Sequence, residues 1–114
     1  MKTVLITGAT SGIGEQMALD YAKDGWQVIA CGRNPESLAN LSSDENIESL
    51  RFDITDSQQI AEIGRSHTEA LDLVILNAGT CEYIDDVTAF DTDLFKRVIN
   101  SNVIGTADCA AAFI

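Results

Sequence analysis

A glycine-rich turn near the amino terminus constrains this chain more than any other stretch. The segment Thr7-Gly8-Ala9-Thr10-Ser11-Gly12-Ile13-Gly14 follows a short apolar run, Val4–Ile6, and leads into a segment with apolar residues at helical spacing. Gly8 can turn the chain off a strand, Gly12 can let the backbone approach a pyrophosphate, and Gly14 can let a helix pack on the sheet. Alone such a segment can be a plain turn, but these flanks favour a phosphate site at the helix start.

The rest of the chain alternates apolar runs with amphipathic segments. We predict strands at 3–7, 27–31, 47–52 and 71–76, helices ending near 24, 42 and 66, and a last helix over 91–114. This alternation predicts an α/β fold with a parallel sheet of strand order 3-2-1-4, the first two helices on one face and the last two on the other. A ligand then belongs at the carboxyl ends of the first and fourth strands, where Thr7–Gly14 and Asn77-Ala78-Gly79 converge.

Local signals predict how the middle helices begin and which side the last helix buries. Asn34 followed by Pro35 is typical of a helix start, and Thr55-x-x-Gln58 and Asp56-x-x-Gln59 are alternative capping boxes for the third helix. The inward stripe of the last helix is predicted to hold Phe95, Val98/Ile99, Asn102, Thr106, Cys109/Ala110 and Phe113.

Charge and composition exclude several kinds of partner and site. The net charge of −11 argues against nucleic acid, and no apolar run approaches the length of a membrane span. The length fits one domain over residues 1–114. The first residues leave no room for a signal peptide, so we expect this domain to be cytoplasmic. Cys31, Cys81 and Cys109 are expected to be reduced thiols, and with a single histidine no metal site is expected.

Four motifs together resemble the short-chain dehydrogenase/reductase family. They are the glycine turn, Phe52-Asp53-Ile54-Thr55, Asn77-Ala78-Gly79 and Asn102-Val103-Ile104-Gly105, in the family's order and spacing. The turn Gly-x-x-x-Gly-x-Gly matches the family's short branch. The resemblance implies a Rossmann-type doubly wound sheet and an oxidoreductase that moves a hydride between NAD(P)(H) and a small-molecule carbonyl or alcohol.

The resemblance also implies roles for particular residues. Asp53 would accept from the adenine amino group, with the Ile54 backbone nearby, and Asn77, Ala78 and Gly79 would line the cofactor cleft. Asn102 matches the asparagine of the family's catalytic tetrad. Alternative readings are a helix-entry residue for Asp53, an ordinary turn for 77–79 and a hydrogen-bonded helix asparagine for Asn102. The pyrophosphate would be held by Thr7, Gly8, Thr10, Ser11, Gly12, Ile13 and Gly14.

The chain departs from the family pattern in one large respect. The family's active site also needs a serine and a Tyr-x-x-x-Lys, but Tyr21 is followed four residues later by Gly25, and Tyr83 by Val87. We therefore expect the amino-terminal half of a longer reductase, with a sheet incomplete at its carboxyl end. The 114 residues alone are expected to be inactive, and the full-length protein is expected to be a homo-oligomer.

The end of the second strand indicates the cofactor. Gly32 stands where NAD-preferring folds place an acid for the ribose hydroxyls, and Arg33 follows it. An arginine without a neighbouring acid favours NADP as the cofactor, with NAD as the second choice. The alternative for Arg33 is a solvated loop arginine. A non-catalytic NAD(P)-binding module or redox sensor stays open as an alternative function. A methyltransferase is disfavoured by Asn77–Gly79 together with Asn102. A P-loop phosphotransferase is excluded because Glu15, and not the P-loop lysine, follows Gly14.

Overall fold

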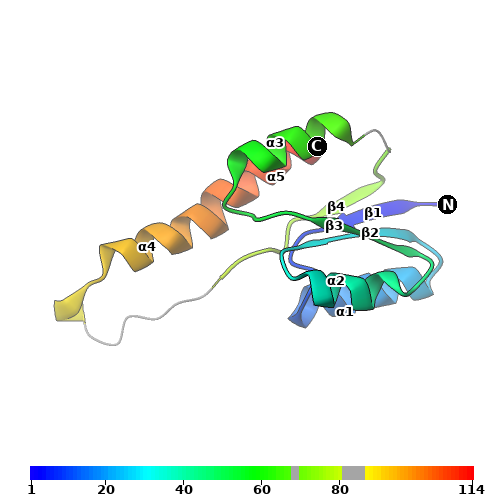
Figure 1. The fold of residues 1–114 in the computed structure, drawn as a ribbon, viewed down its shortest axis with the longest axis horizontal. Helices are drawn as coiled ribbons and strands as arrows, with labels where there is room; N and C mark the ends of the chain where they lie inside the picture. The colour runs from blue at the N-terminus through cyan, green and yellow to red at the C-terminus, as the bar shows by residue number, and fades with distance from the viewer. Residues whose placement is uncertain (68–69, 81–86) are drawn as a thin grey trace.

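A four-stranded parallel sheet forms the centre of the molecule (Figure 1). The computed structural model describes residues 1–67, 70–80 and 87–114. The strands β1 (Thr3–Ile6), β2 (Gln27–Gly32), β3 (Ile47–Arg51) and β4 (Leu73–Ile75) lie in the order β3-β2-β1-β4. The predicted strand order is therefore confirmed. β4 is shorter than predicted, and Cys81, Tyr83 and most of the predicted loop after β4 lie outside the described residues.

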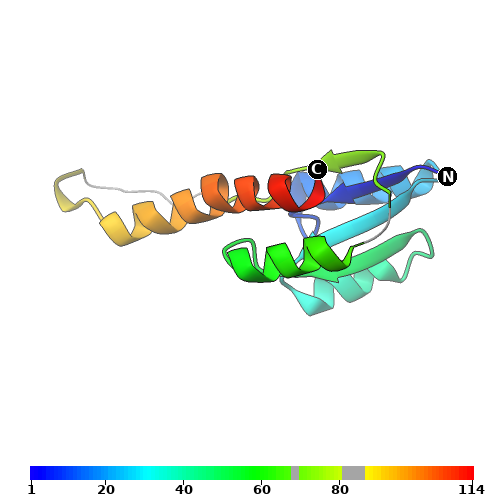
Figure 2. The same ribbon diagram turned by 90° about the horizontal axis from the view of Figure 1, so that it is seen from above.

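Helices cover both faces of this sheet. α1 (Gly12–Lys23) and α2 (Pro35–Ser42) lie on one face, and α3 (Ser57–Ser66) and α5 (Gly105–Phe113) on the other (Figure 1). A 3-10 turn, η1 (Val87–Ala89), precedes α4 (Thr92–Ile99), and a π-helical turn, η2 (Asn100–Ile104), joins α4 to α5. The predicted distribution of helices is confirmed for every helix except α4, which extends beyond the sheet (Figures 1 and 2).

Alternating strand residues build one core on each face of the sheet. Val4 and Ile6 of β1 face α1 and α2, where they pack with Ala18, Ala22 and residues of β2. Leu5, between them, faces α3 and α5 and packs with Ile29, Phe52, Ile60, Cys109 and Phe113. Such alternation without polar interruption is what a parallel strand buried on both faces requires.

The helix starts follow the predicted caps with one difference. The Asn34 side-chain oxygen accepts from the backbone N–H groups of Glu36 and Ser37, with Pro35 in the first turn of α2. Asp56, not Thr55, caps α3 by accepting from Gln59 N at 3.0 Å. In a full capping box the Gln59 side chain would in turn accept from the Asp56 backbone N–H. Here it accepts instead from the Asp53 backbone N–H, at 3.1 Å.

The predicted inward stripe of the last helix is wrong at Phe95 and Asn102, while Val98 and Ile99 between them are half-buried. Phe95 is 51% exposed and Asn102 is exposed, whereas the buried residues are Gly105, Cys109 and Phe113. Two causes act together: α4 has no sheet beneath it, and the π-helical turn breaks the 3.6-residue phase on which the stripe was drawn (Figure 2).

Candidate cofactor site

The carboxyl ends of β1 and β4 are joined through one buried hydroxyl. Thr7 is 2% exposed, and its Oγ1 accepts from the backbone N–H groups of Asn77 and Ala78, each at 3.0 Å. The Asn77 Nδ2 donates to the Gly8 carbonyl oxygen at 3.3 Å. Gly8 has φ +65°, and a Cβ there would lie 2.8 Å from the Ala78 Cα. The glycine turn and Asn77-Ala78-Gly79 therefore meet, as predicted, at the point where the strand order reverses.

The start of α1 has the features of an anion site. Ser11 occupies the N-cap position but its side chain accepts from no helix N–H, unlike the caps of α2, α3 and α4. Gly12 has φ +58°, and a Cβ there would enter open space. A Cβ at Gly14 would collide with the Gly8 carbonyl oxygen, so glycine allows α1 to pack this closely on the turn. Uncapped N–H groups and the helix dipole then face open space.

A cavity of about 740 Å³ opens at this edge of the sheet. Most of the predicted cofactor residues line it, namely Thr7, Gly8, Thr10, Ser11, Arg33, Ile54, Asn77, Ala78 and Gly79. The remaining predicted residues lie outside its lining, namely Gly12, Ile13, Gly14, Asp53 and Asn102. Ile13 is 74% exposed, and Gly14 is buried beneath the turn.

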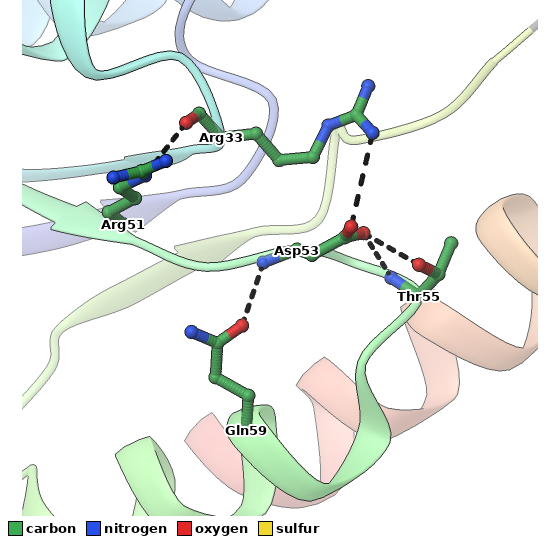
Figure 3. Close-up of polar contacts among 5 residues, drawn as sticks. All are labelled: Arg33, Arg51, Asp53, Thr55 and Gln59. Atoms are coloured by element: carbon green, nitrogen blue, oxygen red, sulfur yellow. Dashed lines mark hydrogen bonds and ion pairs between the residues drawn. The ribbon is translucent and has the colours of Figure 1, made fainter.

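Asp53 and Arg33 face each other beside the cavity (Figure 3). The Asp53 Oδ1 accepts from the backbone N–H and the hydroxyl of Thr55, at 2.9 and 2.7 Å, and its Oδ2 lies 4.0 Å from Arg33 Nη1. The Thr55 backbone N–H and then its hydroxyl hold the pKa of the Asp53 carboxyl below its usual value; partial burial opposes them, and Arg33 adds a smaller effect. The ion pair is long and its side chains are 74% and 42% exposed, so it is weak and a ligand can compete for Arg33.

Asn102 makes a reciprocal pair with the chain beyond β4. Its Oδ1 accepts from Thr80 N and its Nδ2 donates to Thr80 O, both at 2.7 Å. The side chain therefore fastens the segment after Gly79 to the π-helical turn, and it does not point into a helix core as predicted. A Cβ on Gly79 would lie 3.2 Å from Asn102 Oδ1, so this contact also favours glycine at position 79.

The two described cysteines add no nucleophile to the site. Cys31 lines the cavity wall at β2 and Cys109 packs beneath it in the same apolar cluster; both are free thiols. Burial raises the pKa of Cys31 far above its usual value and that of Cys109 to about 11, so both stay protonated. Within the described ranges, no group of three or more His, Cys, Asp or Glu side chains could hold a metal ion.

Sequence reasoning missed several residues of the cavity wall. Arg97, Asn100 and Ser101 come from the end of α4 and the π-helical turn, the helix that carries Asn102. Because this helix was already predicted to bring Asn102 to the site, its neighbouring residues could have been predicted there too. Thr55 could have been found from its spacing to Asp53, which is typical of an Asx turn. Phe52 belongs to the motif Phe52-Asp53-Ile54-Thr55, which was the signal for it, whereas Cys31 and Thr80 carried no distinguishing signal.

Known proteins match this chain over nearly all of its length. The family model described as short chain dehydrogenase matches residues 2–114. The NADPH-dependent pterin aldehyde reductase of Arabidopsis thaliana is 33% identical, over 99% of this chain and 50% of that protein. The serine 3-dehydrogenase of Rhizobium radiobacter is 38% identical, over 90% of this chain and 43% of that protein.

A solved structure gives the same result for the fold. The closed form of a serine dehydrogenase complexed with NADP+ has a TM-score of 0.90 and 26% sequence identity, over 98% of this chain and 47% of that one. The chain thus spans about half the length of the relatives it matches. None of the helices in the described part of the chain is long and apolar enough to cross a membrane. The family match over residues 2–114, together with the sheet order and the turn at its reversal point, shows that the chain belongs to the short chain dehydrogenase family.

Proposed function

We propose that this chain is the cofactor-binding half of an NADP-dependent oxidoreductase that transfers a hydride between NADP(H) and a small-molecule carbonyl or alcohol. The observation that carries the proposal is the 740 Å³ cavity at the reversal point, with the uncapped start of α1 on one side and Arg33 on another. Its volume is in the range of ligand pockets, roughly 300–1,000 Å³. The family membership supplies the reaction type.

The residues present fit a dinucleotide. The uncapped N–H groups at the start of α1 can donate to a pyrophosphate, and we infer that Asp53 and Ile54, on the segment after β3, contact the adenine. The bound nicotinamide would supply or accept the hydride. The backbone N–H groups of Asn77 and Ala78 donate to the Thr7 hydroxyl, which fixes the chain beyond β4 beside the glycine turn where both line the cavity.

The choice of NADP follows from the end of β2. Gly32 carries no carboxylate, and a Cβ there would collide with the Thr10 side chain, so an acidic side chain could not be added without moving Thr10. Arg33 and Thr10 both line the cavity and can donate to a 2′-phosphate. Two relatives support this choice by name, a reductase described as NADPH-dependent and a dehydrogenase solved with NADP+.

We also infer that the full-length protein is a homo-oligomer. Four large apolar side chains on and beside α4 are exposed, namely Phe90, Phe95, Val103 and Ile104, each between 46% and 56%. Phe90 and Phe95 pack on each other, with ring centroids 6.0 Å apart, just before and within α4, the helix that extends beyond the sheet (Figure 1). Exposed apolar patches of this kind mark interaction surfaces.

Cofactor titration tests the proposed function. In a full-length form of the protein we expect NADPH to bind more tightly than NADH, with a gap that shrinks as salt screens the exposed arginine. Arg33→Ala should weaken NADPH binding by about tenfold or more and leave NADH nearly unchanged. Arg65→Ala, which removes an exposed arginine on α3 outside this cavity, is the matched control. Equal affinities in the wild type, or an equal loss of both in Arg33→Ala, would refute the assignment.

A further inference from the structure

A second arginine, Arg51, holds the peptide of Arg33. Arg51 is the last residue of β3 and pairs in register with Gly32, the last residue of β2. Its Nε donates to the Arg33 carbonyl oxygen at 3.0 Å (Figure 3). The next residue, Phe52, donates its backbone N–H to the Gly32 carbonyl oxygen, also at 3.0 Å. Two consecutive carbonyls at the end of β2 are therefore bonded by two consecutive residues at the end of β3.

The backbone and the side chain of Arg33 are held very differently. Its carbonyl is bonded by Arg51, and the following residue, Asn34, is fixed as the cap of α2. Its side chain is 74% exposed, and among the residues that the structure describes its guanidinium has one charged partner, Asp53, at 4.0 Å. Figure 3 shows the Arg51 side chain against the backbone of Arg33 while the Arg33 side chain extends away toward Asp53. An anchored backbone with a releasable side chain is suited to presenting a cation to a ligand.

We propose that Arg51 is a positioning residue for 2′-phosphate recognition, acting through its hydrogen bond to the Arg33 carbonyl. This inference rests on the proposed function and deepens it, because it assigns part of the NADP preference to a residue outside the cavity wall. The bond keeps the end of β2 in the orientation from which Arg33 reaches the phosphate. The loss of one such bond should weaken 2′-phosphate binding by about threefold to tenfold.

The hydrogen bond and the charge of Arg51 can be separated by two substitutions. Glutamine carries its Nε2 the same number of bonds from Cα as arginine carries Nε, so Arg51→Gln keeps a donor and removes the charge. Arg51→Met places a methyl group there and removes both. A contribution through the hydrogen bond therefore predicts that Arg51→Gln behaves like the wild type and Arg51→Met does not.

The test uses two nucleotides that differ in the 2′-phosphate. Adenosine 2′,5′-bisphosphate and adenosine 5′-monophosphate are titrated calorimetrically into full-length wild type, Arg51→Gln, Arg51→Met and the control Arg65→Met. We expect Arg51→Met to lose about threefold to tenfold in affinity for the bisphosphate and to keep its affinity for the monophosphate. Arg51→Gln and Arg65→Met should match the wild type. Hydrogen exchange at residues 32–34 should be faster in Arg51→Met alone.

The outcomes separate this inference from the proposed function. A wild type that binds both nucleotides equally refutes the proposed NADP preference, and the role of Arg51 with it. A wild type that prefers the bisphosphate while Arg51→Met keeps that preference refutes the role of Arg51 only. Equal losses in Arg51→Gln and Arg51→Met assign the effect to charge and also overturn the positioning role.

Discussion

At the scale of single residues, Asn102 connects the end of β4 to the last helix. Its amide bonds both backbone groups of Thr80, so it determines where the chain after Gly79 lies beside the cavity. In a full-length form we expect Asn102→Ala to lower kcat by about tenfold or more, because small displacements at a reacting centre are costly. Cofactor affinity should change much less.

Steady-state kinetics and cofactor titration of Asn102→Ala check this expectation. Asn40→Ala, which changes an exposed asparagine on α2, is the control. Unchanged turnover in Asn102→Ala would show that Asn102 has no role in the reaction. Unfolding of the variant, without a specific loss of kcat, would show that its role is structural.

Asp53 makes the stability of this edge depend on pH. Its pKa is lowered in the folded protein by the two Thr55 donors, so its contribution is present above the unfolded pKa, roughly 4. The contribution is lost as the pH falls through the lowered folded pKa. Asp53→Asn should therefore unfold at a lower temperature than the wild type near neutral pH, and the two curves should converge below about pH 4.

Thermal unfolding followed from pH 7 downward measures that convergence. Glu45→Gln removes an exposed carboxylate elsewhere and controls for the loss of one negative charge. A gap between Asp53→Asn and wild type that stays constant down to pH 2 would contradict the assignment.

The position of a site residue was predictable where it depends on a single strand end or turn. Gly8 and Asn77, 69 positions apart, were placed together because each follows an apolar strand, and they are hydrogen-bonded. The contact of Arg51 with Arg33 was not predictable, because it depends on the register between β2 and β3. Asn102 was assigned to a buried stripe because a regular helix was assumed.

At the scale of elements, close packing of α5 depends on Gly105. A Cβ at Gly105 would lie 2.5 Å from the Ile54 carbonyl oxygen and 2.6 Å from Ile54 Cγ1. Overpacking costs about 1–3 kcal/mol and alanine gains about 1 kcal/mol in helix propensity, so Gly105→Ala should destabilise the protein by up to about 2 kcal/mol. The strain would also shift Ile54, which lines the cavity.

Chemical denaturation of Gly105→Ala measures the cost. Ala107→Gly, at an exposed position of α5, calibrates the propensity difference between the two residues in this helix. Stabilisation of Gly105→Ala by that calibrated amount would show that α5 and the Ile54 loop are not in tight contact.

The elements themselves were largely predictable, with the last helix as the exception. Apolar runs bounded by glycine and caps such as Asn34 located β1 to β3 and the ends of α1 to α3 within about one residue, whereas β4 begins two residues later than predicted. The π-helical turn that divides the last helix into α4 and α5 was not predictable, because no proline or helix-ending glycine marks it in the sequence. Gly105, inside the Asn102–Gly105 motif, follows the π-helical turn, but its importance lies in the contact with Ile54.

At the scale of the whole molecule, we expect the 114-residue chain alone to reduce no carbonyl substrate. Neither Tyr21 nor Tyr83 has a lysine four positions later, and both described cysteines stay protonated. NADPH oxidation by the purified 114-residue protein, with a full-length form as the positive control, tests this. Turnover above background in the short chain would contradict it.

The strand pairings of β1 differ in how much chain they must close. Leu5 pairs with Ile29 across 24 residues and with Val74 across 69. The longer closure costs about 1 kcal/mol more in loop entropy, so β1 and β2 should associate first during folding and β4 should join later. Since Thr7 contacts Asn77 only after that event, we expect the cavity to assemble late, when β4 joins the sheet. We therefore expect a bound nucleotide to slow unfolding most where β1 pairs with β4, the pairing that should open first if folding follows this order.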